Sequence, residues 1–208
     1  MHHLKPAVIP CVLFSMLILM SWIGCSSPVK LPELAHDDVV LAFGDSITFG
    51  TGAKPHESYP ARLETIIGRK VINAGVPGEV TAQGLARLAG LLEREKPALM
   101  ILCHGGNDQL RKLNLEQSAE NLRQMIRLAR NNNVSVVLIA VPAPGLFVSP
   151  SPLYRNIASE YAVLLEEKTL SDILADSSFK SDLIHPNAAG YQRLAEAVAL
   201  LLKKHGAI

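Results

Sequence analysis

The chain has 208 residues, a formal net charge of +1 and only 5% aromatic residues. This length suits one domain that buries a substantial core. The balanced charge indicates no basic face, and the few aromatic side chains argue against a base-stacking surface, so we expect no nucleic-acid partner.

The N-terminus has the pattern of an export signal. Lys5 and two histidines precede an apolar segment, residues 7–23, and Gly24 then stands before Cys25. A charged start, an apolar stretch and a small residue before a break are typical of a signal that is removed after export.

The end of this segment, Ile23-Gly24-Cys25, resembles the end of a bacterial lipoprotein signal. The resemblance implies that residues 1–24 are removed and that Cys25 receives lipid. An uncleaved membrane anchor is the alternative, although ~17 apolar residues are marginal for crossing a ~30 Å hydrocarbon core. Under both interpretations, the domain is exported to the bacterial cell envelope. It is then anchored to a membrane and faces the periplasm or the cell exterior. Residues 25–37, which contain two prolines and few apolar residues, are predicted to form a tether.

Residues 38–208 alternate short apolar runs with stretches in which apolar residues recur at helical spacing. Strands are predicted at 39–43, 71–74, 99–102, 135–141 and, as a short or irregular fifth strand, 169–170. Helices are predicted at 58–67, 81–93, 115–131, 154–166 and 187–204.

Strands that are apolar throughout are buried on both faces, and strands that alternate with helices form a parallel sheet with right-handed crossovers. We therefore predict an α/β domain, a three-layer α/β/α sandwich with a mostly parallel, flavodoxin-like central sheet of about five strands.

Cysteine and histidine usage predicts neither a disulfide nor a metal site. Only Cys103 lies in the exported domain, where a buried small hydrophobe is its expected role. His104 and His56 lie within reach of the sheet edge, but a zinc site requires clustered ligands. We expect no metal and no cofactor.

Glycine-rich or polar segments follow the predicted strands. Residues 44–46 follow the first strand, 75–78 the second, 104–108 the third and 142–150 the fourth. In such a sheet, ligands bind beyond the carboxyl ends of the strands, so these segments are expected to gather at one edge.

The residue types at this edge point to acyl-transfer chemistry. A serine hydroxyl becomes a good nucleophile when a histidine takes its proton and a carboxylate orients that histidine. Ser46, His185 and Asp182 supply these groups. Each residue alone has a structural interpretation: Ser46 as a turn or helix N-cap, His185 in the loop before the last helix, and Asp182 as a solvated loop acid. Asn107 and Gly78 likewise suit turns.

Taken together, four blocks in the same order resemble the SGNH (GDSL) hydrolase superfamily over residues 39–204. The blocks are Gly44-Asp45-Ser46, Asn73 to Gly78, Gly105-Gly106-Asn107-Asp108, and Asp182 to Asn187. The segments Gly84-Leu85-Ala86-Arg87-Leu88 and Gln109-Leu110-Arg111 are most similar to the bacterial thioesterase I, lysophospholipase and arylesterase branch.

This resemblance implies a role for each matching residue. Ser46 would be the nucleophile, His185 the general base and then the general acid, and Asp182 the residue that orients His185. The oxyanion hole would consist of the main-chain N–H groups of Ser46 and Gly78 and the side chain of Asn107. The remaining two acids, Asp45 and Asp108, would support their loops.

The leading functional hypothesis is a membrane-tethered, monomeric serine esterase that hydrolyses acyl esters, thioesters or lipids. A cell-envelope carbohydrate O-deacetylase remains an alternative, because the same residues serve that reaction. A catalytically silent envelope-binding module is a third possibility. The complete set of predicted site residues argues against it.

Overall fold

A computed structural model describes residues 1–2, 29–143 and 148–208. Five parallel strands form its central sheet in the order β2-β1-β3-β4-β7. They are β1 (Val40–Gly44), β2 (Val71–Gly75), β3 (Leu99–Cys103), β4 (Ser135–Ile139) and β7 (Leu164–Glu166). All residues of β1 and β3 are buried, as their continuous apolar sequence predicts. The predicted parallel, flavodoxin-like sheet is confirmed.

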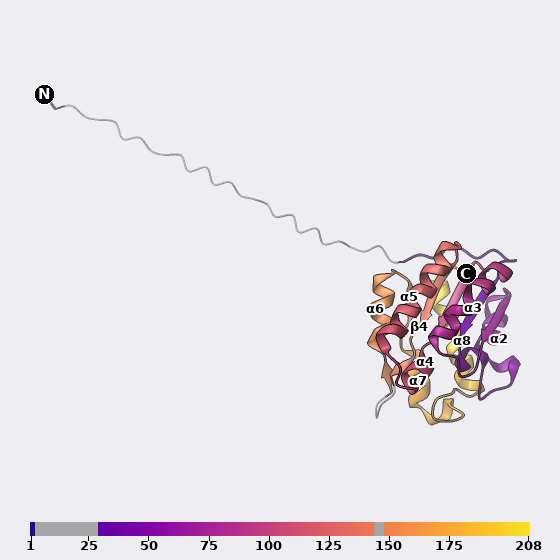
Figure 1. Ribbon diagram of the computed structural model, residues 1–208. Helices are drawn as coiled ribbons and strands as arrows, with labels where there is room; N and C mark the ends of the chain where they lie inside the picture. Colours follow the sequence, from indigo (N-terminus) through magenta and orange to yellow (C-terminus); the bar gives the residue numbers. More distant parts are fainter. Residues whose placement is uncertain (3–28, 144–147) are drawn as a thin grey trace.

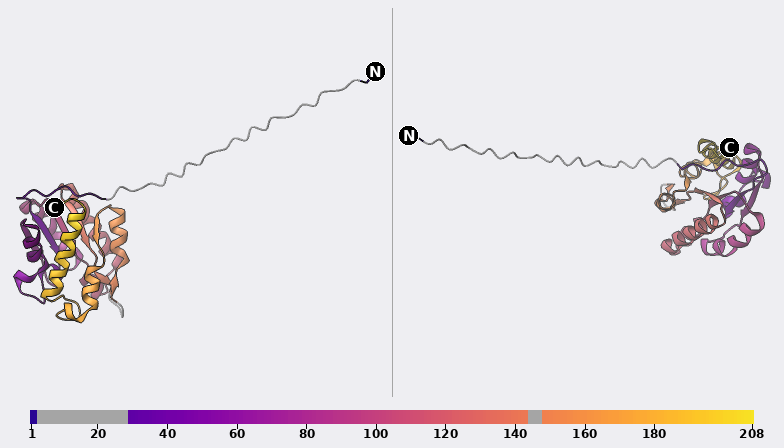
Figure 2. Two further views of the ribbon diagram at one scale, coloured as in Figure 1. Left: turned by 180° about the vertical axis from the view of Figure 1, so that it is seen from behind. Right: turned by 90° about the horizontal axis from the view of Figure 1, so that it is seen from above.

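Helices cover both faces of this sheet, which gives the predicted three layers (Figure 2). Helix α2 (Tyr59–Ile67) packs against α8 (Ala188–Lys204) on one face, whereas α3 (Thr81–Glu95) packs against α5 (Leu115–Asn131) on the other. The apolar side of α5 is buried, at Leu122, Met125, Ile126 and Ala129.

The fifth strand was predicted in the wrong place. Residues 154–166 were expected to form one helix, but α6 (Pro152–Glu160) ends earlier and β7 follows it. Ala162 has a positive φ of 44°, which breaks the helix, and Leu164 then pairs with β4. The expected strand at 169–170 is instead the start of helix α7 (Thr169–Ala175). Leu165 and Glu166 suit a helix as well as an edge strand, so local pattern did not separate the two.

Short elements surround the carboxyl end of the sheet, where α4 and α7 lie in Figure 1. They are α1 (Ser46–Phe49), the 3₁₀ turns η1 (Pro55–Glu57) and η2 (Ser177–Phe179), α4 (Gly106–Leu110), and the two-residue strands β5 (Pro142–Ala143) and β6 (Ser149–Pro150). Strand β4 was predicted to reach Val141, but it ends at Ile139 and β5 begins three residues later.

The segment predicted to be a tether belongs in part to the domain. The main-chain N–H groups of Leu31 and Leu34 donate to the carbonyls of His205 and Ala207, and Leu34 is buried in the core. These contacts place the segment at the pole opposite α4 and α7, beside the C-terminus (Figure 1). Burial of Leu34 therefore draws part of the predicted tether, residues 31–34, onto the domain. Cys25 and residues 7–23 lie outside the described residues.

Candidate active site

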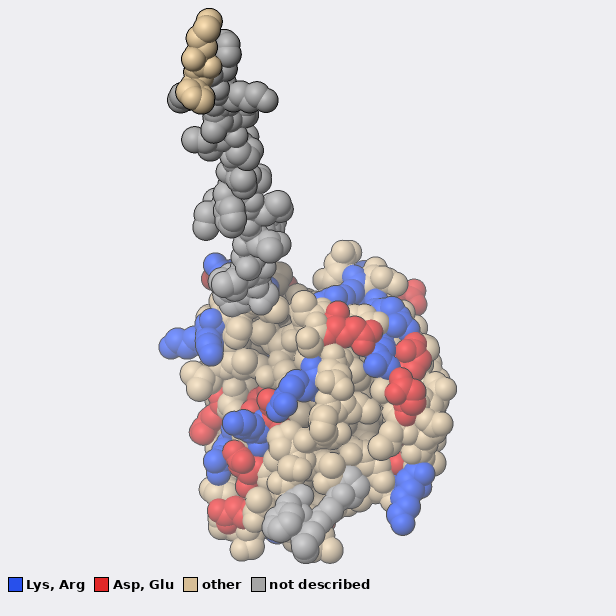
Figure 3. All heavy atoms as spheres, turned by 90° about the vertical axis from the view of Figure 1, so that its left-hand side faces the viewer, with Lys and Arg blue, Asp and Glu red and all other residues tan. Residues whose placement is uncertain are grey.

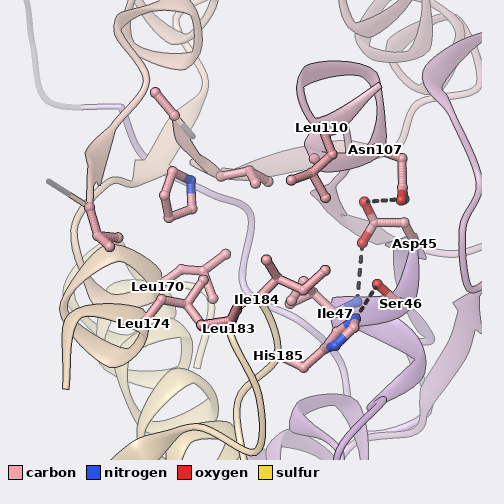
Figure 4. A pocket seen from close by; sticks show the side chains of 15 residues that line it. Asp45, Ser46, Ile47, Asn107, Leu110, Leu170, Leu174, Leu183, Ile184 and His185 are labelled. Atoms are coloured by element: carbon pink, nitrogen blue, oxygen red, sulfur yellow. Dashed lines mark hydrogen bonds between the residues drawn. The ribbon is translucent and has the colours of Figure 1, made fainter. Parts of the chain in front are cut away.

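A cleft of about 230 Å³ opens at the carboxyl end of the sheet (Figure 4). Its lining is mostly apolar, with a small polar group at one side that contains Ser46, Asn107 and His185. The apolar lining residues are Ile47, Leu110, Val141, Pro142, Ala143, Val148, Leu170, Leu174, Leu183 and Ile184. Such a site can enclose a hydrocarbon chain while its polar side meets a functional group.

Ser46 enters the cleft because the chain turns directly from β1 into α1. Asp45 caps this short helix, and its Oδ1 accepts a hydrogen bond from the N–H of Ile47 at 3.1 Å. The turn places Ser46 at the first position of α1, where it lines the cleft.

Asp182 and His185 reach Ser46 from the loop before α8. His185 Nε2 lies 3.0 Å from Ser46 Oγ, and His185 Nδ1 lies 2.8 Å from Asp182 Oδ2. The other Asp182 oxygen accepts the main-chain N–H groups of Ile184 and His185, both at 2.8 Å. Partial burial raises the pKa of Asp182, but the hydrogen bonds from His185 and from these two N–H groups outweigh that effect and lower the pKa overall. The structure therefore joins all three predicted residues by hydrogen bonds.

Asn107 lies across the cleft mouth from His185, on α4 (Figure 4). Its side-chain Nδ2 donates to the carbonyl of Glu79 at 3.0 Å and to Asp45 Oδ2 at 3.4 Å. The second contact is longer than the usual range of about 2.7–3.2 Å, so the amide proton that makes it is weakly held and available to a stronger acceptor in the cleft.

Gly78 occupies a turn and is not among the residues that line the cleft. Its φ of +78° suits glycine, so the turn interpretation of this residue holds. Among the described residues, the main-chain N–H groups of Gly78 and Ser46 donate to no protein acceptor. Their role as oxyanion donors stays a prediction.

Asp45 and Asp108 are both buried and bind their surroundings through hydrogen bonds. Asp108 accepts from the N–H and hydroxyl of Thr81 at 2.9 and 2.6 Å and from Ser118 at 2.9 Å. Asp45 caps α1 and contacts Asn107. Both carboxylates tie neighbouring elements together at the sheet edge, which fits the expected supporting roles.

Three buried or partly buried charged and polar side chains that the sequence analysis did not assign to the site lie behind this edge. Glu79 accepts from Arg87 Nε and Nη2 at 2.7 and 2.6 Å and from His104 Nε2 at 3.1 Å. Burial raises the pKa of Glu79, but the hydrogen bonds from His104 and Arg87 outweigh it and lower the pKa to about 2. A signal was available in the sequence: His104 stands at the end of an apolar strand, and Arg87 lies three residues after Gly84 on one helix.

His104 and Cys103 do not gather with other metal-binding side chains. Cys103 is fully buried, and burial raises the pKa of its thiol. Within residues 29–143 and 148–208, no three His, Cys, Asp or Glu side chains are placed to hold a metal ion. No helix in the same described ranges is long and apolar enough to cross a membrane. Acidic and basic side chains are interspersed on the face shown in Figure 3.

Comparison with known proteins agrees with this geometry. The model of the GDSL-like lipase/acylhydrolase family matches residues 42–193. The chain belongs to this family. It is 34% identical to the esterase TesA of Pseudomonas aeruginosa, over 86% of this chain and 95% of the relative.

A further relative and a solved structure lie in the branch that the sequence resembles. Thioesterase 1/protease 1/lysophospholipase L1 of Escherichia coli K12 is 29% identical, with 80% of this chain and 84% of the relative covered. A crystal structure of TesA superposes with a TM-score of 0.73 and 30% identity, over 81% of this chain and 99% of the other. The protein is therefore a carboxylic ester hydrolase of the GDSL family.

Proposed function

We propose that this esterase uses Ser46 as the nucleophile on an acyl ester or thioester. The observation that carries the proposal is the unbroken hydrogen-bonded series Ser46–His185–Asp182, with distances of 3.0 and 2.8 Å, at the mouth of an apolar cleft. A serine, an imidazole and a carboxylate in this order are the groups that acyl transfer requires.

In the first half of the reaction, Ser46 Oγ attacks the carbonyl carbon while His185 Nε2 takes its proton. Asp182 accepts the Nδ1–H of His185, which fixes the tautomer with a bare Nε2 and stabilises the imidazolium that forms. The tetrahedral intermediate then collapses, and the C–O or C–S bond breaks. The departing alcohol or thiol takes the proton from His185 and leaves the acyl group on Ser46.

The second half of the reaction repeats these proton transfers with water. His185 removes a proton from a water molecule, which attacks the acyl carbon, and then returns that proton to Ser46 Oγ as the carboxylic acid leaves. During both halves, the negative oxygen of the intermediate would accept hydrogen bonds from the N–H groups of Ser46 and Gly78 and from the Asn107 amide.

The apolar lining of the cleft favours a hydrocarbon acyl group over an acetylated sugar, because it offers few partners for sugar hydroxyls. The test is a panel of p-nitrophenyl esters of graded chain length, run beside acetylated xylan and peptidoglycan. We expect kcat/KM to rise from acetyl to longer acyl groups. Higher turnover of the acetylated polysaccharide than of every ester would favour the O-deacetylase, and no turnover of any substrate would favour the silent module.

We further propose that the enzyme is a bacterial envelope lipoprotein anchored through Cys25. The support is the sequence pattern of residues 1–28 and the start of domain contacts near Val29. Cys25→Ala should abolish metabolic labelling by palmitate and block cleavage before residue 25. A membrane-bound protein that keeps Met1 would indicate the uncleaved anchor, and a soluble mature protein with another N-terminus would rule out both.

A further inference from the structure

We infer that Glu79, Arg87 and His104 form a positioning unit that holds the oxyanion donors in place, although none of the three belongs to the proton relay. This inference rests on the proposed function. Its three residues come from three places, the turn after β2, helix α3 and the end of β3, and they meet behind the sheet edge.

The main chain of Glu79 contacts or adjoins two of the predicted oxyanion donors. Its carbonyl accepts one proton of the Asn107 amide at 3.0 Å, which fixes the plane of that amide. The residue before it is Gly78, the other predicted donor in this turn. Any shift of Glu79 therefore moves both Asn107 and Gly78 relative to Ser46.

Glu79 is itself held in place by its side chain. Its carboxylate is buried and accepts three donors, two from Arg87 and one from His104. The guanidinium fork binds both carboxylate oxygens, which restricts rotation more than a single contact would. Arg87 Nη2 also donates to the carbonyls of Ala74 and Gly44, at 2.9 and 3.3 Å. The Glu79 turn is thus fastened to the ends of β1 and β2, directly beside Ser46.

His104 is fully buried. Its Nδ1 accepts the main-chain N–H of Gly105 at 3.0 Å, so the proton of the neutral ring lies on Nε2 and points to Glu79. The His104 carbonyl accepts the hydroxyl of Tyr154 at 2.8 Å. The ring therefore links Glu79 to the segment that begins α4 and carries Asn107.

Helix α3 is shaped to accommodate this unit. A Cβ atom on Gly84 would lie 2.5 Å from His104 Nε2, so only glycine lets the helix approach the ring this closely. Arg87, one turn later, reaches Glu79 and also stacks on Phe43, with its Cζ 4.2 Å from the ring centroid. The Gly84 to Leu88 segment, which forms no part of the proton relay, therefore has a role at the donor end of the site.

Glu79→Gln is the most direct test, because it replaces one acceptor oxygen by an amide donor that faces other donors. The matched control is Glu95→Gln, which removes an exposed ion pair with Arg94 from the end of α3, the helix that also carries Arg87. Gly84→Ala gives a second, milder perturbation that presses on His104 and deletes no polar group, so the inference remains testable if Glu79→Gln does not fold.

The measurements are kcat and KM on p-nitrophenyl butyrate per active site titrated with a fluorophosphonate, and Ki for a trifluoromethyl ketone that forms a tetrahedral adduct with serine. We expect Glu79→Gln to lower kcat by ~10-fold or more, to raise Ki by a similar factor and to change KM little. Gly84→Ala should shift kcat and Ki in the same direction by less, and Glu95→Gln should leave all three unchanged.

A purely structural role would give a different result, namely a lower melting temperature or a smaller titrated fraction with kcat per titrated site unchanged. That outcome, or no change in any variant, would overturn the inference and leave the proposed function intact. Failure of the fluorophosphonate to modify Ser46 in the unaltered enzyme would instead count against the proposed function.

Discussion

The two sides of the active site are built differently. On the relay side, His185 and Asp182 reach Ser46 from the loop before α8, and the Asp182 side chain is 52% exposed. The donor side, Asn107 and Gly78 with the positioning unit Glu79, Arg87 and His104, rests on buried contacts between strands and α3. We infer from this difference that the relay side transfers protons near solvent. The donor side instead keeps a fixed geometry, because moving one of its buried groups would break several hydrogen bonds.

The largest expected effect comes from replacing the nucleophile of the relay side. Ser46→Ala should remain folded, because among the described residues the Ser46 hydroxyl has one hydrogen-bond partner, His185. Turnover of p-nitrophenyl esters should fall by ~1000-fold or more, since the members of such a relay act as a unit. Near-normal turnover in a homogeneous preparation would remove Ser46 from the mechanism.

A smaller loss should follow Asp182→Asn. The asparagine amide presents a donor where His185 Nδ1–H needs an acceptor, so the favourable tautomer is lost while the nucleophile stays. We expect a loss in kcat that is ~10- to 100-fold smaller than that of Ser46→Ala. Asp108→Asn is the comparison for the other acid and should chiefly lower the melting temperature. The assignment fails if Asp108→Asn abolishes kcat and Asp182→Asn does not.

On the donor side, Asn107→Ala should lower kcat by ~100-fold with a smaller change in KM, because the amide binds the oxyanion more strongly than the ground-state carbonyl. Asn107→Asp keeps the turn-forming shape but presents no amide proton. Kinetics and melting curves on both variants separate the two roles, since a variant that melts early and keeps its kcat would identify Asn107 as a turn residue only.

The smallest expected effect concerns acid stability. The pKa of Glu79 is about 2 in the folded protein, against an ordinary value of 4.5, so its ionised form stabilises the fold. That contribution is complete above about pH 4.5 and is lost as the pH falls toward 2. The free energy of unfolding should therefore differ most between the wild type and Glu79→Gln at neutral pH, and the gap should narrow below pH 4.5. Urea titrations at several pH values provide the measurement, and a gap that stays constant to pH 2 would contradict the assignment.

The sequence predicted the parallel sheet and placed Ser46, Gly78 and Asn107 at its edge because continuous apolar runs identify buried strands, and these residues follow them closely. Asp182 and His185 precede the last helix and were assigned through the resemblance of their block.

The sequence-based prediction failed where the apolar segment was too short to show a helical or a strand period. Leu164 to Glu166 suits either a helix or a strand, and only pairing with β4 decides between them. The positioning unit was missed for another reason, since Glu79 and His104 are 25 residues apart and their contact exists only after β2 and β3 have taken their places on either side of β1.

Covalent labelling of the nucleophile is the sharpest test of Ser46 as the residue that attacks the ester. The full-length enzyme is treated with a fluorophosphonate until ester hydrolysis stops, and the modified peptide is then mapped by mass spectrometry. We expect one phosphonyl group per chain, attached to Ser46. Labelling should be much slower in His185→Ala, because the base is absent. Complete inhibition with the label on another residue, or with Ser46 unmodified, would contradict the assignment of Ser46.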